Sequence, residues 1–301
     1  MPMLFLLLLS LHCAASLAMA VTAQRVSLST GLSMQHLEAR PASATTTPPV
    51  LFVHGTFHGA WCWQSRWMEY FADRGVECHA ISLRGTSGSP VEQRSIKISE
   101  HVEDIHSFVE EVLQQPPILV GHSFGGATCL KYLEAGLPAS GLALLCSVPP
   151  SGNGPMTLRF LGRSLRDAFL ITKGFAMKTA AKNVDDCRAL FFDDLTTDAE
   201  IEGLLPMLQA DAKVGLDLAY FNRNLPARAA GEDGRATWLG SAPPAVVIGA
   251  TRDAVVDEEG VRETARFLGT DAEFFDLPHD VMLCSGWEQP AQRLVEWVKA
   301  L

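Results

Sequence analysis

A serine between two glycines marks the segment in which this chain is best equipped for covalent chemistry. Residues 121–126 read Gly-His-Ser-Phe-Gly-Gly, directly after the apolar run 118–120 and before a helix-like stretch. This is the pattern of a nucleophile elbow, a sharp turn from a strand into a helix that exposes the serine hydroxyl. Side chains two residues away would crowd such a turn, which suits Gly121 and Gly125. The pattern predicts Ser123 as a nucleophile.

Two further residues follow Ser123 in an order that suits catalysis. A serine hydroxyl is a poor nucleophile at neutral pH, so it needs a base, and the base needs a carboxylate that orients it. Asp253 follows the strand-like run 245–248, and His279 follows the run 272–277. The carboxyl ends of parallel strands meet at one edge of a sheet. We therefore predict that Asp253 and His279 join Ser123 in a catalytic triad.

Simpler roles were weighed for both residues. Asp253 could cap a turn or a helix, although Asp257 stands closer to the next helical pattern and fits a cap better. His279 could be a surface-loop histidine, but no other histidine follows Asp253 in the chain. The ordered trio is therefore favoured over two unrelated structural residues.

An oxyanion hole requires two backbone N–H donors that point to the developing negative charge. Phe124, the residue after the serine, provides one candidate donor, and Thr56 in the loop 54–63 provides the other. Gly55 lets the backbone of that loop approach a ligand. His54 and His58 in the same loop have the spacing of metal ligands, but no acidic residue is near them in the sequence. We predict oxyanion donors here and no metal site.

The remaining sequence alternates between short apolar runs and longer helical patterns. The runs are bounded by Gly or Pro and resemble strands buried on both faces: 50–53, 76–83, 118–120, 142–146 and 245–248. Helical spacing is found between them, at 63–74, 98–113 and 124–135. This alternation predicts an α/β fold with a mostly parallel, doubly wound sheet. The alternating segment 33–40 is expected to add an antiparallel edge strand.

A long stretch without strand-like runs separates the run 142–146 from the run 245–248. Residues 152–230 contain several helical patches and no convincing strand. We expect residues 31–150 and 240–301 to form the core and residues 151–239 to form an all-helical lid inserted between two sheet strands. The pair Phe191-Phe192 would line an apolar pocket or pack the lid on the core.

The composition limits the possible partners and the compartment. The chain has 301 residues, 48% of them hydrophobic, and a formal charge of −10 without a basic cluster, which argues against nucleic-acid binding. Of the seven cysteines, Cys13 falls in the first 20 residues. Buried thiols explain the other six better than a disulfide framework, because no C-x-x-C or zinc spacing occurs.

The first 20 residues resemble a secretory leader. A Leu-rich block at 4–11 precedes small residues that end in Ala18-Met19-Ala20, which is typical of an A-x-A cleavage site. The block is too short to span a bilayer, so no stable membrane span is expected after cleavage. We predict the secretory pathway or secretion. A plastid or other organelle leader is the alternative, because the following residues are poor in acids.

These motifs together make the chain resemble the α/β-hydrolase superfamily from about residue 33 to residue 301. The segment 54–63, HGTFHGAWCW, is similar to the plant methylesterase and hydroxynitrile-lyase branch. The ending HDVML, before Gly286-Trp287, is closer to generic microbial members. The resemblance implies a nucleophile, a base, its orienting acid and two oxyanion donors at Ser123, His279, Asp253, Thr56 and Phe124.

The resemblance also separates the possible reactions. Haloalkane dehalogenases and epoxide hydrolases of this fold use an aspartate where this chain has Ser123. Hydroxynitrile lyases carry threonine at the position of Gly55 and lysine at that of Asp280, so lyase activity is disfavoured. Many relatives have aspartate at Ser82, but that position is usually structural. Hydrolysis is the reaction that fits these positions.

We therefore expect a cofactor-free serine hydrolase that acts on a small or medium carboxylic ester. Relatives with the same triad cleave C–C bonds, thioesters or amides, and the residues do not separate these bonds from esters. A non-catalytic small-molecule receptor is a second class, because some receptors of this fold keep the triad. Turnover of an ester panel distinguishes the two classes.

Overall fold

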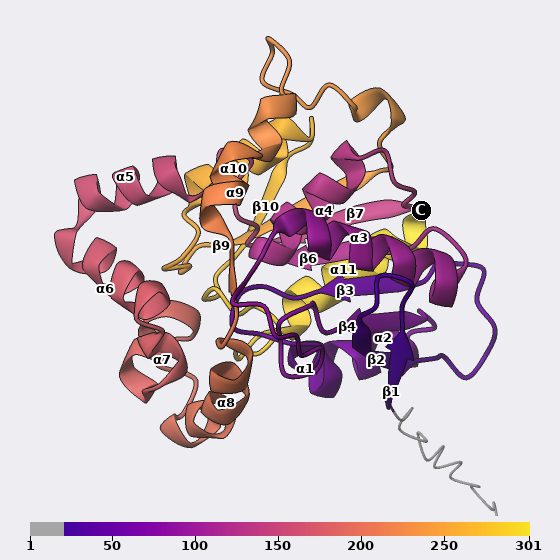
Figure 1. Ribbon diagram of the computed structural model, residues 1–301, viewed down its shortest axis with the longest axis horizontal. Helices are drawn as coiled ribbons and strands as arrows, with labels where there is room; N and C mark the ends of the chain where they lie inside the picture. The colour runs from indigo at the N-terminus through magenta and orange to yellow at the C-terminus, as the bar shows by residue number, and fades with distance from the viewer. Residues whose placement is uncertain (1–20) are drawn as a thin grey trace, which may run out of the picture.

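Eight strands form one sheet in the order β1-β2-β4-β3-β6-β7-β9-β10 (Figure 1). The computed structural model describes residues 21–301; the leader predicted at 1–20 lies outside the described residues. The strands are β1 Thr22–Ser27, β2 Ser33–Ala39, β3 Val50–Val53, β4 Cys78–Ile81, β6 Ile118–His122, β7 Gly141–Leu145, β9 Ala245–Ala250 and β10 Ala272–Phe275. The pairs β1/β2 and β2/β4 are antiparallel, and all the other pairs are parallel. The sheet is therefore mostly parallel, as the alternation of runs predicted.

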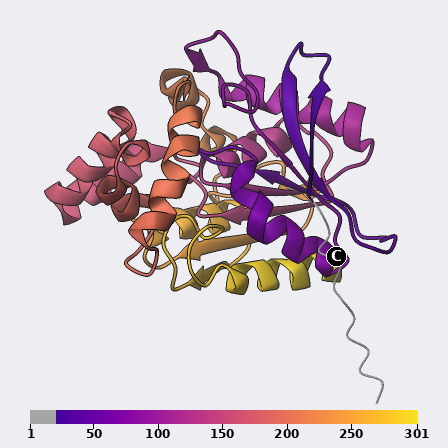
Figure 2. The ribbon, with the colours of Figure 1, turned by 90° about the horizontal axis from the view of Figure 1, so that it is seen from below.

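Helices cover both faces of this sheet, which explains why its central strands are apolar throughout. Every residue of β3, β4, β6 and β7 is buried. Figure 2 shows α2 and α11 on one face and α3 and α4 on the other. The core helices are α1 Trp61–Trp63, α2 Glu69–Asp73, α3 Ile98–Phe108, α4 Phe124–Glu134, α10 Glu258–Phe267 and α11 Glu288–Ala300. Two π-helical segments, Gln64–Met68 and Val109–Leu113, follow α1 and α3.

The chain between β7 and β9 is mainly helical, and its first four α-helices extend away from the sheet on the left of Figure 1. Its α-helices are α5 Asn153–Arg163, α6 Leu165–Ala176, α7 Val184–Phe191, α8 Asp198–Asp211 and α9 Leu218–Arg223. Short 3-10 helices lie at Thr179–Ala181, Pro226–Ala229 and Leu239–Ser241. The two-residue strand β8, Gly215–Leu216, pairs with β5, Ser95–Ile96. The expectation of an insertion without any strand was therefore wrong at these two residues.

The edge of the sheet also differs from the expectation. Strand β2 does not form the edge, because β1 pairs along its outer side. Most of β1 is exposed, and its sequence, TAQRVS, contains one large apolar residue, Val26. Backbone hydrogen bonds to β2 hold this strand in place, so it does not need the apolar side chains from which a strand is predicted.

Four segments with chemistry-bearing residues begin where parallel strands end. The loop 54–60 follows β3, and Ser123 follows β6. Asp253 lies three residues after β9, and His279 lies in the loop after β10. Since these four strands run in the same direction, their carboxyl ends lie at one edge of the sheet.

Candidate active site

Ser123 occupies a strained turn between β6 and α4. Its φ of 54° and ψ of −123° are uncommon for a residue with a side chain. Three backbone hydrogen bonds hold it there: its N–H donates to Leu145 at 3.1 Å, and its carbonyl accepts from Gly126 and Val148 at 3.0 and 3.1 Å. A Cβ on Gly125 would lie 2.3 Å from the carbonyl oxygen of Val53. The surrounding structure thus maintains the strain, as is common at functional sites.

Asp253 and His279 are in direct contact. Asp253 Oδ2 lies 2.7 Å from Nδ1 of His279, and both side chains are almost fully buried. The second carboxylate oxygen, Oδ1, accepts the N–H groups of Val255 and Val256. Because Oδ2 is an acceptor, Nδ1 of His279 carries a proton and Nε2 is left as the basic nitrogen. Asp257, by contrast, caps α10 through the N–H of Gly260.

Within the described residues, no hydrogen bond joins Ser123 Oγ to His279; the closest link between the two segments is made by His122. The ring of His122 lies 4.7 Å from that of His279. Its Nε2 donates to the backbone carbonyl of His279 at 3.0 Å. Burial, followed by the neighbouring His279, lowers the pKa of His122 to about 3, so this ring is neutral. His122 packs in the interior as expected, but its partner is the segment of the predicted base.

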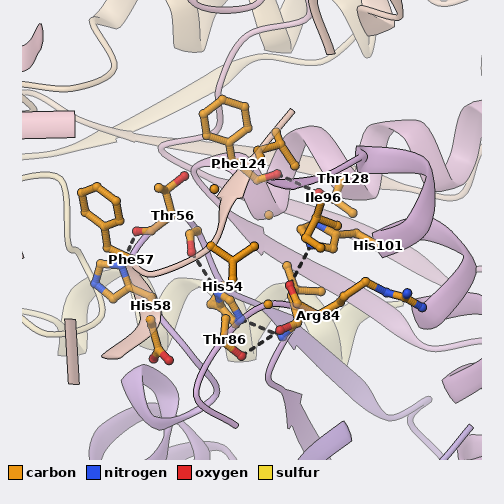
Figure 3. A pocket seen from close by; sticks show the side chains of 18 residues that line it. His54, Thr56, Phe57, His58, Arg84, Thr86, Ile96, His101, Phe124 and Thr128 are labelled. Atoms are coloured by element: carbon orange, nitrogen blue, oxygen red, sulfur yellow. Dashed lines mark hydrogen bonds between the residues drawn. The ribbon is translucent and has the colours of Figure 1, made fainter. Parts of the chain in front are cut away.

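The loop 54–60 lies directly against the Ser123 turn. A Cβ on Gly55 would be only 2.7 Å from Ser123 Cβ, so glycine permits the contact. Among the described residues, neither the N–H of Thr56 nor that of Phe124 has a hydrogen-bond acceptor. Both residues line a cavity of about 60 Å³, shown in Figure 3. The two N–H groups that the sequence singled out are thus free to bind an anionic oxygen.

A buried pair of side chains near Asp253 and His279 was not found from the sequence. His58 Nε2 lies 2.9 Å from Oδ2 of Asp280, the residue after His279. The expectation that His58 has no acidic partner was wrong, because that expectation considered only neighbours in the sequence, and Asp280 is 222 residues away. His54 has a separate role: its Nε2 accepts the N–H of Leu83.

Cys146 adds a thiol beside the predicted acid. It has a φ of 46° at the end of β7 and is completely buried. Burial, followed by the charge and hydrogen bond of Asp253, raises the pKa of this thiol well above its usual range, so it stays protonated. The other cysteines of the described chain are also free and buried, in agreement with the prediction: Cys62, Cys78, Cys129, Cys187 and Cys284.

Three clusters combine side chains of metal-ligating types. Two of them share His279, which lies with Cys146 and Asp253 on one side and with His122 and Asp280 on the other. The third combines Glu38 of β2, His79 of β4 and Glu77, the residue before β4. In that cluster Arg40 already bonds Glu38 at 2.6 Å and approaches Glu77 at 3.7 Å. Hydrogen bonds and a guanidinium thus account for these groupings in the described chain.

Comparison with known proteins adds a family to this geometry. A family model described as "Alpha/beta hydrolase family" matches residues 50–297. Methylesterase 10 of Arabidopsis thaliana is 35% identical over 154 residues, covering 48% of this chain and 49% of that protein. Putative methylesterase 13, chloroplastic, of the same plant is 29% identical over 167 residues, covering 52% and 37%. The chain therefore spans about half or less of these curated relatives.

A solved structure is similar in fold over almost the whole chain. A thermophilic esterase from Thermogutta terrifontis superposes with a TM-score of 0.68 at 16% identity, covering 93% of this chain and 98% of that one. At this identity the likeness shows the fold alone. Within residues 21–301, no helix has both the length and the apolar character needed to cross a membrane.

Proposed function

The chain belongs to the alpha/beta hydrolase family, as its motifs predicted, and we propose that it hydrolyses a small carboxylic ester through an acyl intermediate on Ser123. The observation that carries the proposal is the 2.7 Å contact between Asp253 and His279 at the same sheet edge as the strained Ser123 turn. A buried carboxylate that leaves Nε2 of a histidine unprotonated is the arrangement that activates a serine.

In the first half of the reaction, Ser123 Oγ bonds to the ester carbonyl carbon and its proton passes to His279 Nε2. The carbonyl oxygen becomes anionic and accepts hydrogen bonds from the N–H groups of Thr56 and Phe124. Asp253 stabilises the imidazolium of His279 and remains ionised. His279 then returns the proton to the leaving alkoxide as the carbon–oxygen bond breaks.

In the second half, water attacks the acyl group on Ser123. His279 accepts a proton from this water, and the same two N–H groups stabilise the second oxyanion. Collapse of the intermediate breaks the bond to Oγ, and the proton on His279 returns to Ser123. The products are one alcohol and one carboxylic acid, and each step uses only groups of this chain, the substrate and water.

We assign this cavity, which Thr56 and Phe124 line but Ser123 and His279 do not, to one side of the ester, so that its size limits that side. A volume of about 60 Å³ accepts roughly two water-sized groups. Its wall includes apolar side chains from both short strands and from the loop before β8, namely Ile96, Leu216 and Val214. The two Arabidopsis relatives are named methylesterases. Methyl esters are therefore the first substrates to test, with the methyl group or a short acyl chain in this cavity.

We also propose that the helical region 151–239 acts as a lid. Two buried carboxylates tie it to the core. Asp211, at the end of α8, accepts from Trp61 Nε1 at 2.7 Å and from the N–H of Ser87 at 2.6 Å. Arg159 of α5 forms two hydrogen bonds with Asp257. Phe191 of α7 stacks on His279 at 6.1 Å, so this region contributes directly to the surroundings of the base.

A matched set of substrates tests the proposed reaction. The methyl ester, butyl ester, thioester and primary amide of one small carboxylic acid are compared for kcat/KM with the wild type and Ser123→Ala. We expect the methyl ester to be the best substrate and the variant to lose at least about 10³-fold in kcat. Faster cleavage of the thioester or amide would correct the bond class. Ligand binding without turnover of any compound would favour a receptor.

We further propose that residues 1–20 form a secretory leader that is cleaved after Ala20. Three relatives named chloroplastic make an organelle leader the alternative. Fusion of residues 1–20 to a fluorescent reporter in plant cells separates the two, because a secretory leader sends the reporter to the medium and a transit peptide sends it to the plastid.

A further inference from the structure

A buried ion pair lies behind the predicted base, and the proposed reaction makes no direct use of it. His58 is 1% exposed and Asp280 is completely buried. Nε2 of His58 lies 2.9 Å from Oδ2 of Asp280. Burying two ionisable groups without function is costly, because their hydration is lost and only good geometry compensates for it. The burial of this pair therefore needs an explanation, which we seek in the segments that the pair connects.

The hydrogen bonds of His58 define its protonation state. Its Nδ1 lies 2.9 Å from the carbonyl oxygen of Thr56, and its Nε2 faces the carboxylate of Asp280. A carbonyl and a carboxylate only accept hydrogen bonds, so both ring nitrogens must donate. A histidine that donates from both nitrogens is an imidazolium. With Asp280 ionised, this geometry places a positive charge on His58.

The neighbouring groups support this charge. Burial opposes it, but the attraction and hydrogen bond of Asp280, then the Thr56 carbonyl and Asp211, outweigh burial and raise the pKa of His58. Two other histidines nearby, His54 and His122, have their pKa lowered by burial to about 4 and 3.

The partner carboxylate is ionised for matching reasons. Burial would raise its pKa, but His58 first, then His122 and His279, lower the pKa of Asp280. The thiol of Cys62, which also faces this site, has its pKa raised by burial and then by Asp280 and Asp211, so it is neutral. Among the described residues, Oδ1 of Asp280 has no hydrogen-bond donor, and Nε2 of His122 lies 4.0 Å from it, so His58 is the one side chain that hydrogen-bonds this carboxylate.

The imidazolium closes a strained turn in the oxyanion loop. Phe57, between Thr56 and His58, has a φ of 68°, which is rare for an aromatic residue. The hydrogen bond from His58 back to Thr56, drawn as a dashed line in Figure 3, spans this residue. Two aromatic rings pack on the imidazole of His58. The ring of Trp61 is stacked on it with the centroids 5.4 Å apart, and the ring of Phe191 meets it edge-on at 5.7 Å.

We propose that His58 and Asp280 form a positioning pair, in which the imidazolium ties the carbonyl of Thr56 to the segment that carries His279. One end of the pair holds the residue whose N–H binds the oxyanion, and the other end is the residue next to the base. The pair thus sets the spacing between the oxyanion donor and the base. The inference rests on the proposed function, because this spacing matters only if Thr56 and His279 act on one substrate.

The pair has a defined pH range. The raised pKa of His58 keeps the imidazolium intact below that pKa and removes it as the pH rises through it. The lowered pKa of Asp280 means that the carboxylate is lost only in acid. When His58 becomes neutral, one of its two acceptors loses its donor. Turnover is therefore expected to fall on the alkaline side with the pKa of His58.

The first experiment reads the charge on His58 without using activity. Histidine labelled with ¹⁵N is incorporated into Ser123→Ala protein, and ring N–H signals are recorded near pH 7.5, above the ordinary histidine range. We expect one histidine of the nine in the chain to show two ring N–H signals that exchange slowly with solvent. The absence of any doubly protonated histidine overturns the proposal, whether or not the protein is a hydrolase.

The second experiment measures kcat and KM against pH for the wild type, His58→Gln and Asp280→Asn. His58→Gln is expected to lower kcat by about 10- to 100-fold with KM changed by less than about threefold, because a shifted oxyanion donor affects the transition state most. Asp280→Asn should move the alkaline limb to lower pH by about one unit or more, because it removes the charge that stabilises the imidazolium.

A matched control separates positioning from a general effect of changing a buried histidine. His79 is 3% exposed but lies on β4 among Glu77 and His36, so His79→Gln should keep the wild-type pH profile. Wild-type kcat and an unmoved alkaline limb in both His58→Gln and Asp280→Asn would overturn the positioning role while leaving the proposed hydrolase intact. If His58→Gln does not fold, Asp280→Asn and the ring signals still decide the question.

Discussion

The carboxylate of Asp253 holds His279 with one oxygen and the backbone with the other. Oδ2 lies 2.7 Å from Nδ1 of His279, and Oδ1 accepts the N–H groups of Val255 and Val256 at 2.7 and 2.8 Å. The two backbone donors orient the carboxylate before any substrate binds. The tautomer of His279 therefore follows from the turn that holds Asp253.

Replacement of Asp253 by asparagine tests this arrangement. The amide oxygen would stay on the N–H groups of Val255 and Val256, so the NH₂ group would face His279. Nδ1 would then have to accept, so the ring proton would sit on Nε2, which could no longer accept the proton that Ser123 must lose. We expect kcat to fall by about 10²- to 10⁴-fold while the melting temperature stays near that of the wild type. A variant with more than a tenth of wild-type kcat would show that Asp253 does not orient the base.

The close approach of the oxyanion loop gives a second prediction. In Gly55→Ala the new methyl group would lie 2.7 Å from Ser123 Cβ and 3.1 Å from the carbonyl oxygen of His122, so the loop must move. We expect a loss of about 10- to 1,000-fold in kcat, since removal of one oxyanion donor has effects of this order. Gly203→Ala in α8, where a Cβ meets nothing within 4 Å, is the control and should retain full activity.

The attachment of the helical region can be tested at Asp211. Asp211→Ala leaves the part-buried N–H groups of Trp61 and Ser87 without their acceptor; an unsatisfied buried donor costs about 1–3 kcal/mol, and part-buried donors lie at the lower end of that range. We expect the free energy of unfolding to fall by about 2 kcal/mol and KM to rise. Urea titration and initial rates measure the two effects. Glu202→Ala, an exposed position on the same helix, should change neither, and an equal loss in both variants would contradict the role of Asp211.

A buried histidine pair predicts a loss of stability in acid. His36 Nε2 and His79 Nδ1 are 2.8 Å apart, and burial first lowers the pKa of each from 6.5 to about 4. Because the folded pKa is depressed, their contribution is fully present above pH 6.5 and is lost as the pH falls towards 4. A shift from 6.5 to about 4 corresponds to about 3 kcal/mol per histidine.

His79→Gln keeps a donor and an acceptor at this position but cannot gain a proton. We therefore expect its unfolding free energy to fall less than that of the wild type between pH 7 and pH 4.5, as measured by urea titration at both values. The quantity compared is the change in the free energy of unfolding between the two pH values. A destabilisation by the substitution that is the same at both pH values therefore cancels. Parallel declines in the two proteins would show that the histidine pair does not control the acid stability.

The sheet and the place of the candidate site follow from local patterns. Buried runs such as 118–122 and 245–250 have no polar alternation, so they predict parallel strands covered on both faces. Parallel strands end at one edge, which is why Ser123, Asp253 and His279 could be grouped before any geometry was known. The sharp turn at Ser123 was foreseeable from Gly121 and Gly125 together with the apolar run before them and the helical stretch after them.

Contacts between residues far apart in the chain could not be predicted, because no local sequence pattern accompanies them. His58 and Asp280 are 222 residues apart, and neither stands in a pattern that points to the other. The histidine pair in β2 and β4 depends on an antiparallel register that apolar residues do not specify. Strand β1 escaped prediction because it is mostly exposed and polar. Side-chain pairs of this kind arise from the packing of elements, and packing is specified by the whole chain.

The central claim is that Ser123 is the nucleophile, and covalent labelling tests it most directly. The protein is treated with a fluorophosphonate, digested, and analysed by mass spectrometry, with Ser123→Ala as the control. We predict a single phosphonyl adduct on Ser123 that forms in parallel with loss of esterase activity and is absent from the variant. An adduct on another residue, or full ester turnover by Ser123→Ala, would contradict the account.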